Sequence, residues 1–490
     1  MTDKKVVTRR GFMESAGVAT GAVVAAGTFA HPAIGKVKGA NDRLNFAILG
    51  PGGRAQAHIN VLLSMKEEGK PVDIVAVCDV YEKNRQRAQE KTKAKQAEVD
   101  YRKVLENKDV DAVVIATPDH WHAKMSIDAM EAGKDVYCEK PMTHTIDEAR
   151  RVAETVKKTR QIMTVGVQST SDPKWKQANE LITSGKIGHV MQAQTQYYRN
   201  GSVGQWRYYP LSKDMTPNTV DWKMFLGTEF GLAPDMPFNR AKFAQWRCYW
   251  EFGGGMYTDL FVHQLTHLIQ AVGVRFPRRV VGGGGLYLEY DGRDVPDVAT
   301  VVADYEEGLQ VIVTASMCSE QYAIPEVIHG HTASIMFRPD GFDVKQEKLS
   351  NRPAPPGANK TEEGVEHVKV DAPRDDTRAL WDHYIECVRS RNPETLCPAD
   401  LGYAAIATVN MGVQSYREGK ALFFDKDTGA ITEADKSWAA RWEERSKLRG
   451  KPNQVIGWKA GTEGSLLEPP AYMKLEGDWV NGKDPAEGLS

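Results

Sequence analysis

The amino-acid sequence predicts an α/β protein in which a doubly wound parallel sheet near the N-terminus is followed by a second α/β domain. Short apolar runs alternate with helix-like stretches between residues 43 and 168, and a glycine-rich turn joins the first run to the first of these stretches. Between about 282 and 320, strand-like segments follow one another with turns between them, which is typical of a further sheet.

Composition is that of a globular protein with a small-molecule ligand. The chain has 490 residues, of which 41% are hydrophobic and 26% charged, so it is long enough for two or three domains. Its 63 Lys and Arg residues nearly balance 65 Asp and Glu residues, which provides no electrostatic footprint for nucleic acid or an anionic membrane. The six cysteines lack C-x-x-C spacing, which argues against a zinc ribbon or a disulfide framework.

The first 35 residues have the features of an export signal. The paired arginines Arg9 and Arg10 precede a weakly apolar run over about 16–30, which ends in small residues. The run is too short and too rich in Gly and Ala to span a bilayer, and no cysteine follows it for lipid anchoring. Residues 1–35 resemble a twin-arginine signal, which implies the twin-arginine translocation machinery as a partner and a periplasmic or otherwise exported location. The alternative is a basic tail with no targeting role.

The turn after the first expected strand, 43–49, indicates a nucleotide site. Its sequence, Gly50-Pro51-Gly52-Gly53-Arg54-Ala55, fits the pattern G-x-G-x-x-A. Glycines in this pattern permit a tight turn and let backbone amides approach a pyrophosphate at the N-terminus of the following helix.

The second expected strand, 72–80, strengthens this interpretation because it ends at Asp79. Asp79 is at about the right distance along the chain to hydrogen bond a ribose 2′-hydroxyl, and an acid there favours NAD over NADP. Lys83 and Arg85 leave NADP open, and an α/β domain that binds no phosphate is the alternative. Further strands are expected at 111–118, 134–141 and 161–168, which together predict a Rossmann domain over residues 43–168.

Two more motifs make the resemblance specific. ATPDHWH at 116–122 and CEKPMTHT at 138–145 lie between the glycine turn and GGGMYTD at 253–259. With these motifs in this order, the chain resembles the Gfo/Idh/MocA family of oxidoreductases, named for glucose-fructose oxidoreductase, inositol dehydrogenase and MocA. The resemblance implies a C-terminal α/β domain over 169–420, whose open, mainly antiparallel sheet lies beneath the substrate and often supports a homo-oligomer. Residues 421–490 exceed the usual family core.

The family also implies a set of site residues. Lys140, the base of the EKP motif, is implied to lie beside the nicotinamide and the substrate hydroxyl, and Asp79 to meet the adenosine ribose. The residues implied to bind the dinucleotide are Gly50, Gly52, Gly53, Arg54, Asp79, Thr117, Pro118, His122, Glu139 and Lys140. Gln168, just past the last expected strand, is a further candidate for contact with either the nicotinamide or the substrate.

The position of Lys140 agrees with that role. Glu139 and Lys140 end an expected buried strand and precede a proline, which places Lys140 at the mouth of the sheet. A lysine buried there would suit proton transfer or the polarisation of an oxygen. The alternative is an ion pair between Glu139 and Lys140 on the surface.

Three polar residues follow the glycines at 253–255. Asp259, His263 and His267 are four apart and would form one stripe on a helix. Asp259 could orient His263, which ordinarily titrates near neutrality and could take the proton of a substrate hydroxyl as hydride leaves the carbon. A zinc site and a purely structural polar face are the alternatives. Gln264 stands where a zinc protease has glutamate, so we expect no metal and expect His267 to pack.

Aromatic residues beside arginines indicate the substrate. They gather at 196–200, 205–210 and 245–255, and they suit a sugar or cyclitol, whose C–H faces stack on rings and whose hydroxyls accept hydrogen bonds. The candidates for substrate contact are Arg199, Trp206 and Arg247. The alternative is that these aromatics belong to the core or to an interface.

Together these features predict an exported oxidoreductase that transfers hydride between a sugar or cyclitol hydroxyl and tightly bound NAD, with Lys140, Asp259 and His263 as catalytic residues. Tight binding is expected because the twin-arginine route exports proteins already folded around their cofactor. An NAD-dependent glycosidase or lyase, which oxidises the sugar only transiently, is the alternative. A sugar-binding or sensory protein on a retired enzyme fold is a third possibility.

Overall fold

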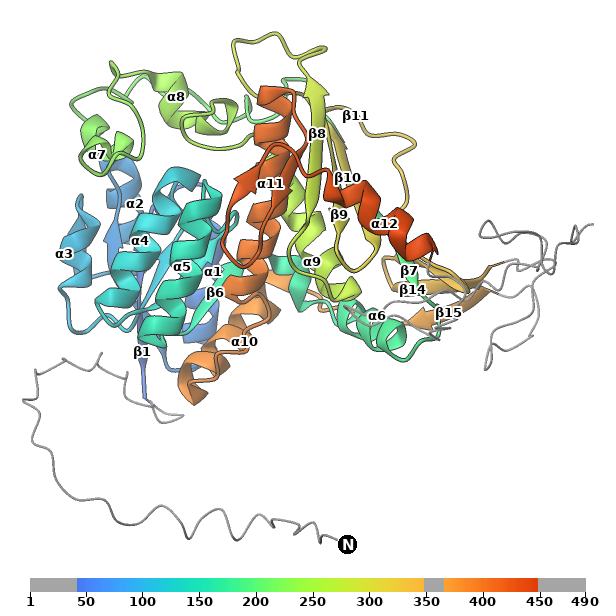
Figure 1. Cartoon of the computed structure of the whole chain (residues 1–490). Coiled ribbons are helices and arrows are strands. Elements are labelled where there is room, and N and C mark those ends of the chain that lie inside the picture. Colours follow the sequence, from blue (N-terminus) through green and yellow to red (C-terminus); the bar gives the residue numbers. More distant parts are fainter. Residues whose placement is uncertain (1–41, 348–364, 448–490) are drawn as a thin grey trace, which may run out of the picture. The chain divides into compact units, whose positions relative to one another are not determined.

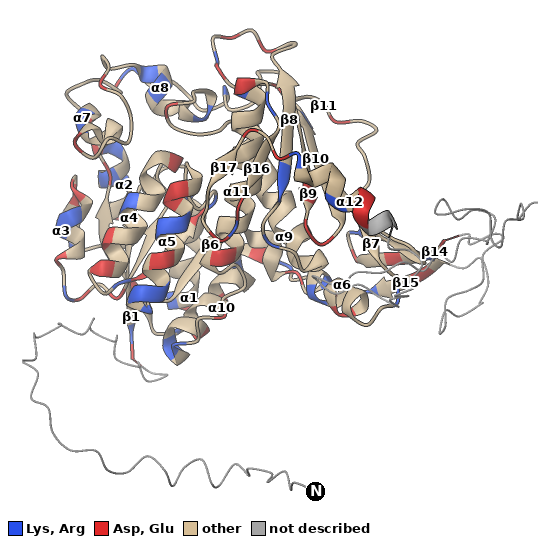
Figure 2. Cartoon of the chain, in the orientation of Figure 1, with Lys and Arg blue, Asp and Glu red and all other residues tan. Residues whose placement is uncertain are grey.

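The computed structural model describes residues 42–347 and 365–447 (Figure 1). The expected export signal at 1–35 and residues 448–490 of the expected C-terminal extension lie outside the described residues. Within the described ranges, no helix is both long enough and apolar enough to cross a membrane. Basic and acidic residues are mixed along the helices, as Figure 2 shows, in agreement with the balanced composition.

The N-terminal domain is a Rossmann fold, as predicted. Its six strands are all parallel and lie in the order β3-β2-β1-β4-β5-β6. The order reverses between β1 and β4, which is where ligands bind in such sheets. The strands are β1 (Leu44–Leu49), β2 (Val72–Cys78), β3 (Gln96–Glu98), β4 (Ala112–Ile115), β5 (Asp135–Glu139) and β6 (Met163–Gly166). The helices are α1 (Ala55–Glu67), α2 (Glu82–Thr92), α3 (Tyr101–Leu105), α4 (Asp119–Glu131) and α5 (Ile146–Thr159).

The second domain contains an eleven-stranded, mainly antiparallel sheet, which confirms the expectation. Its long central strand β7 (Val190–Asn200) pairs in parallel with β10 (Leu309–Ser316) and antiparallel with β12 (Val327–Gly330). The short β11 (Cys318–Ser319) pairs with the end of β7. The other strands are β8 (Arg279–Gly285), β9 (Val298–Tyr305), β13 (Ala333–Arg338), β14 (Gly341–Gln346), β15 (Val365–Lys369), β16 (Leu422–Phe424) and β17 (Ile431–Thr432).

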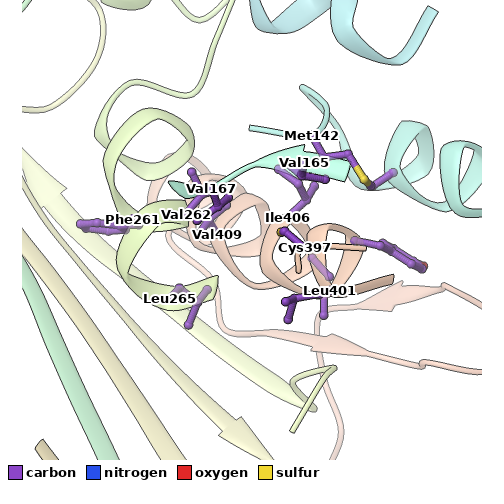
Figure 3. Close-up of a cluster of buried hydrophobic side chains, with 14 of the residues drawn as sticks. Met142, Val165, Val167, Phe261, Val262, Leu265, Cys397, Leu401, Ile406 and Val409 are labelled. Carbon is purple, nitrogen blue, oxygen red and sulfur yellow. The ribbon is translucent and has the colours of Figure 1, made fainter. Parts of the chain in front are cut away.

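Helices pack between the two sheets and join them. Helix α11 (Ala399–Glu418) contacts α5 of the first domain and both β8 and α9 (Val262–Val272) of the second. Figure 3 shows the apolar side chains at this junction, where Met142 and Val165 lie close to Ile406, and Val262 lies close to Val409. Helix α6 (Lys174–Thr183) packs against α9. The junction between the domains is therefore a closely packed, apolar cluster.

The structure adds one detail to the second domain and corrects another. Strand β8 ends at Gly285, because the carboxylate of Asp297 accepts backbone N–H groups from residues 287–289 and turns the chain. In the expected extension, β16 pairs with β8 and is therefore an integral part of the sheet. Helix α12 (Ser437–Lys447) follows β17.

Helix α10 (Asp376–Ser390) completes the core of the first domain although it follows it by more than two hundred residues. The Trp381 ring stacks on Tyr137 of β5 at a centroid distance of 4.4 Å and meets Phe46 of β1 edge-on at 5.4 Å. Leu380 and Tyr384 are buried in the same apolar cluster.

A long connection between β7 and the glycines crosses back over the first domain. We call residues 205–252 the strap; it carries α7 (Trp222–Leu226) and α8 (Arg240–Ala244), which Figure 1 places above the Rossmann sheet. The backbone N–H of Asp221 donates to Val80 at 2.9 Å, and that of Glu82 donates to Thr219 at 3.0 Å. The strap is thus hydrogen bonded to the end of β2 and the start of α2.

Candidate active site

The first of two adjoining cavities, of about 570 Å³, lies where β1, β2 and β4 end. Gly50 has φ +76°, and a Cβ there would lie 2.8 Å from Thr117 Cγ2, so only glycine fits this turn. A Cβ on Gly52 or Gly53 would meet nothing closer than 3.8 Å and would occupy the cavity itself. The turn therefore leaves open backbone at the N-terminus of α1, which fits a pyrophosphate.

Asp79 lies in the same cavity at the end of β2. Its carboxylate accepts the backbone N–H of Tyr81 at 2.8 Å and the Asn84 side-chain amide at 3.2 Å. Burial raises its pKa to about 6. Lys83 also lines the cavity and pairs with Asp214 of the strap at 3.0 Å, whereas Arg85 donates to the main-chain oxygen of Asp79 at 2.9 Å.

The strap supplies the opposite wall of this cavity. Tyr81 donates its hydroxyl hydrogen to Asp214 at 2.6 Å, which holds the strap against β2. None of these wall residues was singled out for the cofactor from the sequence, because only the folded strap brings them over the sheet. The apolar and aromatic residues of the wall are Tyr209, Met215, Met224, Phe225, Phe243 and Trp246.

The second cavity, of about 350 Å³, shares part of its lining with the first, so the two adjoin. Gly53, Arg54, Thr117, Tyr209 and Arg247 line both. Of the residues predicted from the sequence, the first cavity holds Gly50, Gly52, Asp79 and Pro118, and the second holds His122, Glu139, Lys140, Gln168, Arg199, Asp259 and His263.

Lys140 and Asp259 face each other in the second cavity, with side chains that are each 10% exposed. Lys140 Nζ donates to Asp259 Oδ1 at 2.6 Å and to the main-chain oxygen of Asp259 at 2.8 Å. Arg247 Nε donates to the same carboxylate oxygen at 2.9 Å, and the Trp206 indole donates to Oδ2 at 2.9 Å. Despite its burial, Asp259 has a pKa far below the usual value because of the charges of Lys140 and Arg247.

The expectation that Asp259 orients His263 is not met, because Lys140, Arg247 and Trp206 occupy both carboxylate oxygens. Residues 257–261 form a turn of π-helix before α9 begins, which changes the angular offset of residues four apart from its α-helical value. The environment of His263 also does not fit titration near neutrality. Burial and the charge of Lys140 lower its pKa to about 3, so the ring is neutral. Its neighbour is the Tyr197 ring, 6.3 Å away between centroids.

Glu139 does not pair with Lys140, so the surface ion pair considered as an alternative is wrong. Its Oε1 accepts from Arg54 Nε at 2.7 Å and lies 2.8 Å from His58 Nε2. Trp381 Nε1 donates to His58 Nδ1 at 3.0 Å, which leaves the ring proton on Nε2, facing Glu139. The side-chain amide of Gln168 also lies beside Arg54, and its oxygen accepts from the guanidinium. The two ring nitrogens of His122 lie 2.9 Å from the main-chain oxygen of Thr117 and 2.6 Å from that of Pro141, and the one that carries the proton donates.

Trp206 is the substrate candidate that the structure contradicts. It is 1% exposed and lines neither cavity. Its indole N–H instead donates to Asp259 Oδ2. The backbone of the strap is left-handed at this residue, with φ +65°. Arg199 and Arg247 do line the second cavity.

Asp119 is a site residue that the sequence reasoning missed. It begins α4, is 2% exposed, and accepts the Thr258 hydroxyl hydrogen at 3.0 Å on the wall of the second cavity. Burial and the charge of Asp259 raise its pKa, which is about 7, against the lowering effect of Arg247. A Cβ on Gly253 would lie 2.9 Å from its Oδ2, which explains one glycine of the triplet. The sequence offered one signal for Asp119, which is its position between Pro118 and His122, two residues expected to bind the dinucleotide.

His267 points away from Asp259 and packs, as expected. Its ring stacks on Trp175 at 3.9 Å, and its two nitrogens lie 2.9 Å from Ser169 Oγ and 2.8 Å from Glu326 Oε1. The three residues of the stripe therefore do not converge as zinc ligands would. Among the described residues, no group of three or more His, Cys, Asp or Glu side chains is arranged to hold a metal ion.

Comparison with known families decides the assignment of the fold and of the first cavity. Residues 44–167 match the family described as "Oxidoreductase family, NAD-binding Rossmann fold", and residues 179–422 match the C-terminal α/β domain of the same oxidoreductase family. The chain belongs to the Gfo/Idh/MocA family. The Rossmann domain of that family binds NAD, and the glycine turn and Asp79 in the first cavity fit that cofactor.

Individual relatives match over parts of their length. Inositol 2-dehydrogenase of Salmonella typhimurium is 30% identical over 28% of this chain and 41% of its own length. An α-N-acetylgalactosaminidase of Shewanella oneidensis is 25% identical over 41% of this chain and 50% of its own. The chain thus spans half or less of the length of these relatives. A levoglucosan dehydrogenase structure in complex with NADH shares the fold, with a TM-score of 0.57 at 19% identity, over 78% of this chain and 98% of that one.

Proposed function

We propose that this protein oxidises or reduces a sugar or cyclitol at a CH–OH group with tightly bound NAD. The observation that carries the proposal is the position of the Lys140–Asp259 pair in a cavity that adjoins the NAD site through Gly53, Arg54 and Thr117. A substrate in the second cavity would lie within reach of both the pair and the cofactor. Asp79 favours NAD over NADP as the cofactor. The activity measurements below, made with each cofactor, decide between the two.

Bound NAD would supply hydride chemistry, and the protein's residues handle the proton. The ammonium of Lys140 donates to the reacting oxygen and stabilises negative charge that develops there. In the oxidation direction the proton of the same hydroxyl passes to neutral His263, because its lowered pKa keeps one ring nitrogen unprotonated. Asp259, fixed by Arg247 and Trp206, holds the ammonium in place.

A sugar and cyclitol panel tests this function. The purified full chain is incubated with each compound and NAD or NADP, and both cofactor absorbance and product are measured. Stoichiometric ketone or lactone is expected with NAD. Absence of any redox product across the panel, from protein whose loaded cofactor is confirmed by mass spectrometry, would contradict the proposal.

We propose that NAD is tightly bound because the strap forms one wall of the first cavity. A cofactor in the first cavity would be covered by strap residues, and its release would require breaking the contacts of Tyr81 and Lys83 with Asp214. NAD should therefore stay with the protein through gel filtration. The variant Asp214→Asn should lose NAD faster, whereas Asp382→Asn, which is exposed on α10, serves as a matched control.

An NAD-dependent glycosidase is the second candidate, and the similarity to an α-N-acetylgalactosaminidase favours it. In that case glycoside is cleaved with no net NADH. A set of chromogenic glycosides separates the two functions, since leaving-group release without a redox product supports the glycosidase alone.

Export through the twin-arginine route is proposed from Arg9 and Arg10. Tagged full-length protein should appear in the exported fraction, and replacing both arginines with lysine should retain it in the cytoplasm. Equal distribution of the two forms would refute the proposal. A homo-oligomer through the open sheet is proposed as well, and light scattering on the purified protein tests it.

A further inference from the structure

The second cavity contains a cation that no carboxylate neutralises. Arg199, near the end of β7, lines the cavity, and its guanidinium lies 4.6 Å from the centroid of the Tyr197 ring. It also donates to the Tyr197 hydroxyl. Among residues 42–347 and 365–447, no acidic side chain pairs with Arg199. Resting on the proposed function, we propose that the sugar substrate carries an anionic substituent, which Arg199 binds.

The other charged side chains of the cavity are Arg54, Glu139, Lys140, Arg247, Asp259 and Asp119, and the raised pKa of Asp119, about 7, leaves it partly protonated near neutrality. Arg54 pairs with Glu139 at 2.7 Å. Lys140 and Arg247 both pair with Asp259, at 2.6 and 2.9 Å, so two cations share one carboxylate. Arg199 adds a further positive charge to this excess. Because the walls are protein rather than water, an anion in the cavity would be attracted more strongly than at an exposed surface.

The position of Arg199 relative to the reacting groups suits a sugar ring. Tyr197 and Arg199 are two residues apart on β7 and therefore lie on one face of the sheet. The Tyr197 ring neighbours both the Arg199 guanidinium, at 4.6 Å from the ring centroid, and the His263 ring, at 6.3 Å between centroids. A sugar stacked on Tyr197 would present one hydroxyl to His263 and Lys140 and its opposite substituent to Arg199.

The chemistry of the guanidinium selects the substituent. Its planar fork binds two oxygens of one anionic group at once, as in a carboxylate or a sulfate ester. The end of β7 is held by pairing between Arg199 and Ser319 of β11, so the backbone beneath the guanidinium is fixed. Uronic acids and sugar sulfates supply the required group, whereas neutral hexoses do not.

Matched substrates test the inference. Catalytic efficiency is compared for glucose with glucuronate and glucose 6-sulfate, and for galactose with galacturonate. We expect at least one anionic sugar to exceed its neutral counterpart about ten- to hundredfold, the range for a charge-assisted hydrogen bond. Preference for glucuronate over glucose 6-sulfate would identify a carboxylate, and the reverse a sulfate. Equal or higher efficiency with the neutral sugars would overturn the inference.

Variants of Arg199 test whether this residue causes the preference for anionic sugars. Arg199→Gln should reduce the ratio of anionic to neutral efficiency about ten- to hundredfold, and Arg199→Lys should reduce it less, because the charge stays and the fork is lost. Arg150→Gln, an exposed arginine on α5, is the matched control. An unchanged ratio in Arg199→Gln would refute the assignment.

Binding separates this inference from the proposed function. Calorimetry on the NAD-loaded protein measures the affinity for glucuronate and for glucose 6-sulfate whether or not turnover occurs. Binding that weakens at least tenfold in Arg199→Gln, without any redox product, would support the anion site and count against the proposed oxidoreductase. Turnover of neutral sugars without detectable binding of either anion would support the oxidoreductase and refute the anion site.

Discussion

Lys140 meets Asp259 twice, through the carboxylate at 2.6 Å and through the main-chain oxygen at 2.8 Å. The double contact joins the end of β5 in the Rossmann domain to the turn of π-helix that precedes α9 in the second domain. The ammonium is thereby fixed in position and keeps one donor for a ligand.

Replacing Lys140 with Met should lower kcat by two to four orders of magnitude, the usual contribution of a positioned proton donor or acceptor. Asp259 keeps its contact with Arg247, so the fold should persist and NAD should remain bound. Turnover is measured beside NAD content, with Lys124→Met on α4 as the control. Undiminished turnover would exclude Lys140 from the reaction.

Asp259→Asn should both inactivate and destabilise the protein. It leaves Lys140 and Arg247 as two buried cations without a carboxylate, and breaking such a pair typically costs about 3 kcal/mol. A clearly lower midpoint of thermal unfolding is expected, together with a fall in kcat. Asp382→Asn, whose ion pair is exposed, should do neither. A stable, fully active Asp259→Asn protein would contradict the assigned geometry.

Asp119 gives the protein a predictable dependence on pH. Its folded-state pKa of about 7 lies above the ordinary 3.8, so between these values the folded protein holds a proton that the unfolded chain has released. The contribution of Asp119 to stability should therefore fall as pH rises from about 4 to 7, as should that of Asp79, whose pKa is about 6. Buried histidines with lowered pKa values, such as His263, contribute in the opposite direction. Asp119→Asn should remove the first contribution and so make the slope of stability against pH more positive in this range. Urea unfolding at a series of pH values measures the slope; identical slopes would refute the role.

Trp206→Phe tests whether the hydrogen bond from the Trp206 indole holds the Asp259 carboxylate in position. The variant keeps an aromatic ring but loses the N–H that Asp259 accepts, a bond to a charged group worth about 1.5 to 3 kcal/mol. We expect lower stability and about a tenfold loss of kcat with little change in KM. Trp222→Phe, whose indole donates to the main-chain oxygen of Met236, is the control. Equal effects of the two variants on kcat would argue against a specific role.

Gly253→Ala tests the close approach of the glycine triplet to Asp119. The new Cβ would lie 2.9 Å from Asp119 Oδ2 and 3.1 Å from the Trp246 ring, so the wall of the second cavity must shift, at a cost of about 1 to 3 kcal/mol. Lower activity and a lower unfolding temperature are expected. Gly201→Ala, which would meet nothing within 4 Å, should be neutral. A fully active Gly253→Ala protein would show that the wall tolerates the shift.

Local patterns were enough to predict the parallel strands, the glycine turn and the position of Lys140. β4, for example, is apolar throughout because helices cover both faces of the sheet, and such runs are visible in sequence. The π-helical turn at 257–261 was not predictable, because it depends on packing rather than on spacing. The same holds for Asp119 and Trp206, whose roles arise only when the strap and α4 meet the glycine triplet.

The stacking of Trp381 on Tyr137 has a consequence for the design of fragments and chimaeras. The cofactor domain defined by residues 43–168 lacks a piece of its own interior, which α10 supplies from much later in the chain. A fragment that ends near residue 168 would expose the apolar surface that Leu380, Trp381 and Tyr384 cover. Chimaeras that exchange cofactor domains between relatives should therefore transfer α10 together with the first domain. The unit that such an exchange must move as a whole is discontinuous in sequence.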